Sequence, residues 1–268
     1  PFPPQPLLRR VLNTTKLLHY CLRAPSVVDD FGRELDAFAI EHKPDSKAMW
    51  VHLASKIAFF DHAMAVHIQS SALSGFLCSI VENMVSGRSN DSTHEEQGEA
   101  VRLLSGASGV ESAVMLEELD ALIDLVVAHP QAQSEFQQAS VADAQAWLSS
   151  TPQISAAYLR FLDDHGHRGY RELCMRDPAW GDEPGPLIQS MQAAVHARLL
   201  TGGHAPMHTT TIDWSQLSRG LRWVLPKAHN AIRRREHTKS QLVDVAHRFK
   251  CAFRHLGGLL QSEGALPE

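Results

Sequence analysis

Apolar residues recur every three or four positions along most of this chain, which is the spacing that places them on one face of a helix. No run alternates between apolar and polar residues for long enough to indicate a strand. The pattern therefore predicts an all-α fold, a multi-helix domain. The predicted helices cover residues 7–23, 27–38, 139–148, 152–164 and 187–200, with another around Leu116, Leu119, Ile123 and Val126. Residues 46–85 are expected to form either one buried helix or a broken pair of helices.

Prolines and glycines set the expected helix ends. Pro25 is expected to end the first helix, because proline has no backbone N–H to donate and its ring collides with the preceding turn. Pro226 is expected to open a long C-terminal helix that runs toward Leu260. Gly257 and Gly258 weaken the continuity of that helix near its end.

Three stretches lack helical periodicity. Residues 87–99 are polar and rich in turn-forming residues, which predicts an exposed loop, and residues 201–211 form a link between helices. Residues 165–186 contain Gly166 and Gly169 together with several prolines, which predicts a rigid and irregular loop. Loops of this composition often carry function.

Composition bounds the class of protein. The chain has 268 residues, of which 44% are hydrophobic and 21% charged, as is typical of a folded globular protein. We expect one helical domain over residues 1–268, which could divide into lobes at 1–200 and 212–262. The four cysteines are scattered without a CxxC pair, which favours buried thiols in the reducing cytoplasm. No apolar run reaches about 18 residues, so no membrane partner is expected, and the start without methionine suggests a fragment.

The long C-terminal helix suggests an anion-binding site. Residues 219–250 hold nine lysines and arginines although the net charge of the chain is −5, which indicates an anionic ligand or an acidic partner. Arg235 and Lys239 lie one turn apart, so their charged ends can converge on one phosphate. The alternative is that both pair with carboxylates of a neighbouring helix. They interrupt an otherwise apolar stripe that consists of Ala228, Ile232, Arg235, Lys239, Leu242, Ala246, Phe249, Phe253, Leu256 and Leu260.

The irregular stretch at 165–186 holds a second group of polar residues. His167, Arg168 and Glu172 are crowded between two predicted helices. The functional interpretation is that they bind a substrate. The structural alternative is that Arg168 and Glu172, which are four residues apart, pair with each other and tie the two helix ends together.

Other chemistries find little support in the sequence. His62 and His67 are five residues apart and His165 and His167 two apart, so neither pair has the spacing of two zinc ligands in an HExxH helix. We therefore predict no metal site, and a metal-dependent phosphohydrolase is the less favoured alternative. The basic stretch lacks interleaved aromatic residues, so no nucleic-acid partner is expected. No nucleotide-binding glycine motif is present.

The irregular stretch resembles a family signature. Its GHRG motif at residues 166–169 is followed by Glu172, by Pro178-x-Trp180 and by residues 182–184, which read Asp-Glu-Pro. Together these motifs are similar to the central helical domain of the phosphoenolpyruvate synthase-like family, which includes the rifampicin phosphotransferases. Further similarity lies in residues 103–106, 110–113 and 234–240.

The resemblance implies a function. Such enzymes split ATP with Mg²⁺ in an ATP-grasp domain, carry the phosphoryl group on a histidine of a swivelling domain, and hold a small-molecule acceptor in the helical domain. Neither of the first two domains is recognisable here, so this chain resembles the acceptor-binding part alone. We expect it to be inactive by itself and to hold no cofactor. Whether it is an enzyme component or a non-catalytic helical interaction module derived from one is left open.

The resemblance also implies roles for particular residues. Arg235 and Lys239 would face the incoming phosphohistidine and stabilise negative charge during transfer, while His167, Arg168 and Glu172 would bind the acceptor. The sequence has Tyr170-Arg171 where the rifampicin enzymes usually have Pro-Gly, so the resemblance does not imply rifampicin as the acceptor.

Overall fold

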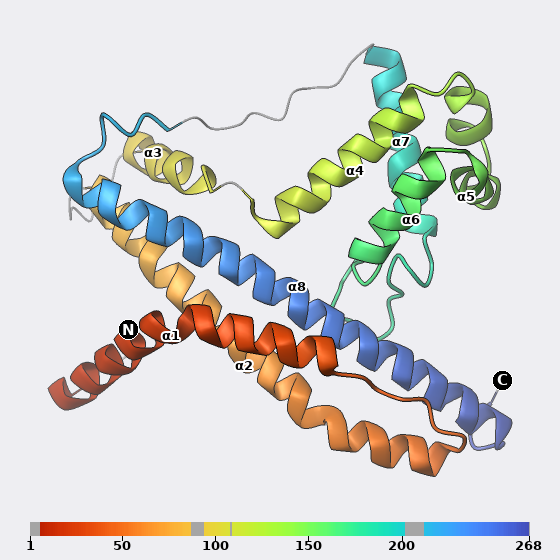
Figure 1. The fold of residues 1–268 in the computed structure, drawn as a ribbon, viewed down its shortest axis with the longest axis horizontal. Coiled ribbons are helices and arrows are strands. Elements are labelled where there is room, and N and C mark those ends of the chain that lie inside the picture. The colour runs from red at the N-terminus through yellow and green to blue at the C-terminus, as the bar shows by residue number, and fades with distance from the viewer. Residues whose placement is uncertain (1–5, 87–93, 108, 202–211, 268) are drawn as a thin grey trace. The chain divides into compact units, whose positions relative to one another are not determined.

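The computed structural model describes residues 6–86, 94–107, 109–201 and 212–267 (Figure 1). Every regular element among these residues is a helix, which confirms the predicted all-α fold and the long C-terminal helix. The elements are α1 (Leu7–Ala37), α2 (Ser46–Val85), α3 (His94–Ser105), α4 (Glu111–Val127), the π-helix η1 (Ala132–Gln137), α5 (Val141–Ser150), α6 (Ile154–His165), α7 (Gly185–Thr201) and α8 (Arg219–Ser262).

Two predicted helix boundaries are wrong because prolines lie inside helices. Pro25 lies within α1 and does not end it, and Pro226 lies within α8 and does not open it. An interior proline removes one hydrogen bond and disturbs one turn. Burial of the flanking residues outweighs that loss, since Ala24 is 1% exposed beside Pro25, and Leu225 and Ala228 are fully buried around Pro226.

The predicted polar stretches at 87–99 and 201–211 lie largely outside the described residues. The helix α3 begins at His94, inside the loop predicted for residues 87–99, and residues 87–93 lie outside the described part of the chain. The link predicted at 201–211 begins where α7 ends, and residues 202–211 also lie outside the described part. The irregular stretch at 165–186 is confirmed as a segment of turns between α6 and α7.

The chain divides into two compact units, each assembled from three separate stretches of sequence. Unit 1 consists of residues 1–39, 56–110 and 209–242, and unit 2 of residues 40–55, 111–208 and 243–268. The helices α2 and α8 each contribute residues to both units.

The core of unit 1 forms where α2, α3 and α8 meet. Val81 of α2, Leu103 of α3 and Leu225 of α8 belong to one buried cluster, and all three are at most 1% exposed. A second small cluster brings α1 into the unit through Ala24, which packs with Ala231 of α8. His229 adds a buried polar contact, because its Nε2 lies 2.8 Å from the carbonyl oxygen of Leu103.

One large buried cluster of unit 2 is built from α4, η1, α5, α6 and α7. Phe136, Tyr158 and Met191 fill its centre and are at most 1% exposed. The amide of Gln192 donates to the carbonyl oxygens of Phe136 at 2.8 Å and of Ala139 at 3.0 Å, which ties α7 to the end of the short π-helix. Arg198 of α7 joins α4 through carboxylates, including Asp120 at 2.7 Å.

The helix α2 is long and apolar enough that its length and composition alone would suit a membrane span, although 28% of the relevant window is buried in the structure. The core helix of a soluble protein meets the same criterion.

Candidate functional site

The predicted cationic pair lies on the part of α8 that belongs to unit 1. Arg235 has 42% of its side chain exposed and Lys239 is exposed, so both are accessible at the edge of the apolar stripe. The guanidinium of Arg235 donates twice to one oxygen of Glu236, from Nη2 at 2.7 Å and from Nε at 3.0 Å. These contacts join Arg235 to the next residue of α8, and not to a carboxylate of a neighbouring helix as the alternative required.

The pair between Arg235 and Glu236 leaves the arginine available to a ligand. An ion pair that is partly exposed contributes only about 0–1 kcal/mol, because water and salt screen it. A phosphoryl group could therefore take over the fork of Arg235 at small cost. In the absence of a ligand, the contact with Glu236 restricts the orientation of the Arg235 guanidinium.

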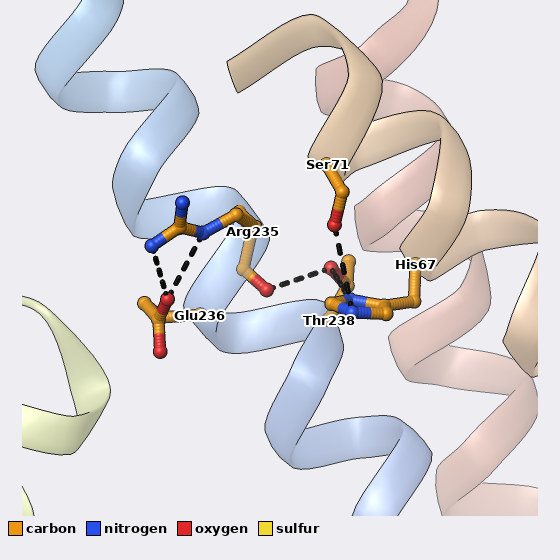
Figure 2. A network of polar contacts seen from close by, with 5 residues as sticks. All are labelled: His67, Ser71, Arg235, Glu236 and Thr238. Carbon is orange, nitrogen blue, oxygen red and sulfur yellow. Dashed lines mark hydrogen bonds and ion pairs between the residues drawn. The ribbon is translucent and has the colours of Figure 1, made fainter. Parts of the chain in front are cut away.

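A polar network fixes this turn of α8 against α2 (Figure 2). The hydroxyl of Thr238, which is 1% exposed, donates to the backbone carbonyl of Arg235 at 3.1 Å. Its oxygen lies 3.3 Å from Nδ1 of His67, and the hydroxyl oxygen of Ser71 lies 3.5 Å from Nε2 of the same ring. The turn that carries Arg235 is thus held by side chains from two helices.

The network also indicates the protonation state of His67. The hydrogen of the Thr238 hydroxyl is committed to Arg235, so the oxygen of Thr238 must accept from Nδ1, and Nε2 is left to accept from Ser71. Burial lowers the pKa of His67, the neighbouring Glu236 raises it, and the nearby Lys239 and Arg235 lower it further, with a net decrease. The contacts are satisfied when His67 is neutral and carries its hydrogen on Nδ1.

An apolar groove of about 720 Å³ lies beside this turn, within unit 1. The wall from α2 is apolar and includes Phe76 and Met84, which are 44% and 40% exposed. The wall from α8 adds polar groups, namely Lys227, Asn230 and Arg234. The remaining residues around the groove are Leu22, Leu73, Leu77, Ile80, Gly220, Trp223, Val224 and Ala231.

The indole of Trp223 forms an exposed aromatic wall of the groove. Trp223 is 68% exposed. Nζ of Lys227 lies 3.7 Å from the centre of a Trp223 ring and donates to the Trp223 carbonyl at 3.0 Å. A cation held over an indole in this way restricts the ring. Sequence reasoning placed Lys227 and Arg234 in a basic stretch but did not predict the groove. The helical spacing of residues 223, 227, 230 and 234 was the signal that could have indicated it.

The loop at 165–186, in unit 2, depends on its glycines. A Cβ on Gly166 would lie 2.2 Å from the carbonyl oxygen of Leu162, and the amide of Gly181 donates to the carbonyl of Gly166 at 2.7 Å. A Cβ on Gly169 would come within 3.0 Å of the carbonyl oxygen of Pro178. The backbone approaches are therefore too close for any residue with a side chain at Gly166.

Arg168 is buried at the centre of this loop. Its side chain is 3% exposed, and its Nη1 lies 3.1 Å from Oε1 of Glu172, which confirms the predicted contact between residues four apart. Neither Nη1 nor Nε of Arg168 makes a well-aligned hydrogen bond, so the contact with Glu172 is an ion pair of imperfect geometry. This burial favours the structural interpretation of the pair. The prediction that Arg168 and Glu172 bind a substrate remains untested.

The histidines of the GHRG stretch lie in a partly buried polar environment. Nε2 of His165 lies 2.7 Å from a carboxylate oxygen of Glu118. Burial lowers the pKa of His167, the charge of Asp244 raises it, and Arg168 and two neighbouring histidines lower it, with a net decrease. His167 is thus neutral at pH 7, and its predicted role in binding a substrate also remains a prediction.

Among the described residues, one cluster of potential metal ligands lies close enough together to hold an ion. It includes neither of the histidine pairs considered from the sequence. It consists of Asp182, His247 and Cys251, all in unit 2. Of the earlier candidates, His62 lies 3.3 Å from a carboxylate oxygen of Glu34 and His67 belongs to the network on α8.

Comparison with known families identifies one match. The family model described as the rifampicin phosphotransferase fourth domain matches residues 67–236, which is more than half of the chain. The matched range contains the loop at 165–186, most of the groove and Arg235, and it ends just before Lys239. No curated protein and no solved structure matches the chain significantly.

Proposed function

We propose that this chain, which belongs to the family of the rifampicin phosphotransferase fourth domain, is the acceptor-binding helical part of an ATP-dependent phosphotransferase. In this proposal the phosphoryl group arrives on a histidine of a separate domain of the same enzyme, and ATP and Mg²⁺ act in a further domain. The acceptor is a small molecule that binds to unit 1.

The observation that carries the proposal is the position of the groove. Its volume of about 720 Å³ lies within the range of roughly 300–1,000 Å³ typical of small-molecule sites. Its α2 wall suits an apolar molecular body. Arg234 lies in its α8 wall, Arg235 is the next residue of the same helix, and Lys239 lies one turn beyond Arg235. An acceptor in the groove could thus present a hydroxyl group near these cations.

The chemistry assigned to the cations is charge stabilisation. In the transfer the N–P bond of the phosphohistidine breaks, an O–P bond forms with the acceptor hydroxyl, and the hydroxyl proton passes to the released imidazole. Such transition states gain from positioned cations and little from covalent help. Arg235 offers two parallel donors to the phosphoryl oxygens, and Lys239 offers a point charge. The network of His67 and Thr238 would keep their turn of helix in place.

The alternative interaction module makes a different demand on the same groove. A non-catalytic module would bind an amphipathic helix of a protein partner through the apolar α2 wall, since Phe76 and Met84 are accessible there. Such a module would not bind a hydroxylated small molecule, and its binding would not depend on Arg235 or Lys239.

The binding part of the proposal can be tested on the chain as it is. Trp223 fluorescence should change saturably when rifampicin or members of a set of hydroxylated aromatic compounds are added. A Trp223→Phe variant should lose this signal, whereas Trp214→Phe, which replaces an indole outside the groove, should keep it. Saturation by an amphipathic helical peptide and by none of the small molecules would favour the interaction module instead.

A further inference from the structure

A carboxylate, an imidazole and a thiol converge within unit 2. Asp182 belongs to the turn that precedes α7, while His247 and Cys251 are one turn apart on the same face of α8. One ligand atom from each residue can be chosen so that all three lie within 4.8 Å of one another. The sulfur of Cys251 is 3.7 Å from Nε2 of His247, and Nδ1 of His247 is 3.9 Å from Oδ2 of Asp182.

These separations suit a shared metal ion. Zinc binds sulfur at about 2.3 Å and imidazole nitrogen at about 2.0–2.1 Å, so two such ligands at a tetrahedral angle are about 3.5 Å apart. The 3.7 Å between Sγ of Cys251 and Nε2 of His247 is close to that value, while Asp182 faces the other ring nitrogen. A rotation of the imidazole or a shift of the Asp182 carboxylate would bring all three ligand atoms to one ion. A set of one sulfur, one nitrogen and one carboxylate oxygen favours zinc over magnesium or calcium, which prefer oxygen ligands alone.

A second observation points to a missing ligand at the same place. Nδ1 of His247 is buried and has no hydrogen-bond partner, although the carboxylate of Asp182 faces it from 3.9 Å. An unsatisfied buried ring nitrogen is uncommon in folded proteins and is destabilising. A metal ion bound at Nδ1 would satisfy this nitrogen.

The charges around the cluster permit a divalent cation. Arg254 contacts the carboxylate of Asp182, and it is 39% exposed, so its guanidinium can turn into solvent when a metal ion replaces it. Lys250 is buried nearby and donates to the carbonyl oxygen of Asp177 at 3.2 Å, which fixes its ammonium group on another acceptor. Asp182 and a cysteine thiolate together would balance the two positive charges of the metal.

We propose that Asp182, His247 and Cys251 form a binding site for a divalent transition metal ion, best matched by zinc, and that the metal fastens the loop at 165–186 to α8. The three protein ligands leave the remaining coordination position to water or another donor. The site is a structural clip within unit 2. It is independent of the proposed transfer reaction, which uses residues of unit 1.

Zinc binding by the purified, reduced and metal-free chain tests this proposal. Calorimetric titration with zinc chloride should show one tight equivalent per chain. Cys251→Ser and Asp182→Asn should each weaken that equivalent by about 100-fold or more, because loss of even an outer-shell partner typically weakens metal binding about 10–100-fold. The matched control Cys174→Ser removes another thiol of the same unit and should bind zinc as the wild type does.

Two further readouts make the result independent of variant stability. Cobalt(II) should give a sulfur-to-metal charge-transfer absorption that Cys174→Ser retains and Cys251→Ser loses. Zinc should also slow proteolysis within residues 165–186 of the wild-type chain. Undiminished zinc affinity in both Cys251→Ser and Asp182→Asn, or cobalt absorption without a sulfur contribution in the wild type, would overturn the proposal.

Discussion

Replacing Arg168 by alanine should destabilise unit 2 more than any exposed charge of the same loop. Arg168 is 3% exposed and pairs at 3.1 Å with Glu172, whose side chain is 21% exposed. Removal of one partner of a buried pair typically costs about 3–5 kcal/mol, because the other charge is left without compensation. Two features reduce that figure here. Glu172 keeps some contact with water, and Arg168 already has two nitrogens without well-aligned hydrogen bonds.

The expected loss in Arg168→Ala is therefore about 2–3 kcal/mol in the free energy of unfolding of unit 2. A change of 1 kcal/mol shifts the melting temperature of a unit of this size by roughly 2–4 °C, so the shift should be about 5–10 °C. Differential scanning calorimetry measures it directly, and limited proteolysis shows whether residues 165–186 become accessible.

Arg171→Ala is the matched control. Arg171 lies in the same loop and forms an ion pair with Asp177 at 2.9 Å, but 65% of its side chain is exposed. Its loss should change stability by less than about 1 kcal/mol, because exposed ion pairs contribute little. Melting temperatures of Arg168→Ala and Arg171→Ala that agree within a degree would refute the reasoning that burial makes the Arg168 pair important.

Two further predictions follow from the geometry. Gly166→Ala should destabilise unit 2 by about 2 kcal/mol or more in chemical denaturation, because its Cβ would lie 2.2 Å from the backbone oxygen of Leu162. The control Gly257→Ala, whose Cβ meets open space in α8, should stabilise the protein by about 0.5–1 kcal/mol. Equal effects of the two substitutions on stability would contradict the close approach at Gly166. The stability of the chain should fall as pH decreases through about 6.5, the histidine pKa in the unfolded chain, because the lowered pKa of folded His67 makes the unfolded state bind more protons. His67→Gln should lose less stability than the wild type between about pH 8 and pH 5, and an unchanged pH dependence would show that His67 does not titrate in this way.

Much of the fold could be predicted from apolar spacing, and the failures have physical reasons. The spacing in α2 and α4 to α7 is regular, so these helices were predicted with small boundary errors. The helix ends predicted at Pro25 and Pro226 were wrong, because the preference of proline for helix ends is a local property. It does not include the burial of the neighbouring residues, which stabilises both helices. The π-helix at 132–137 was not predicted, since its stability depends on Phe136 in the core and on distant Gln192.

The candidate sites divide in the same way. Arg235 with Lys239 and Arg168 with Glu172 were predicted because residues four apart on a helix or turn lie close together. The exposure of the first pair and the burial of the second depend on tertiary packing, which the sequence does not reveal. Helical spacing marks the α8 wall of the groove and the pair of His247 and Cys251, which are one turn apart. The α2 wall of the groove and Asp182 come from distant parts of the sequence, so spacing alone could not indicate either complete site.

The most direct test of the central claim separates the two half-reactions in an enzyme that carries this chain with its ATP-grasp and phosphohistidine domains. In Arg235→Ala and Lys239→Ala, labelling of the histidine from ATP should proceed normally, while transfer to the acceptor should slow by about 100-fold or more. The control Arg222→Ala, an exposed cation of α8, should leave both steps unchanged. Melting temperatures should stay close to the wild-type value, since Arg235 is 42% exposed and pairs with the adjacent Glu236, and Lys239 is exposed. Normal transfer rates in both variants would contradict the assignment of these residues to phosphoryl transfer.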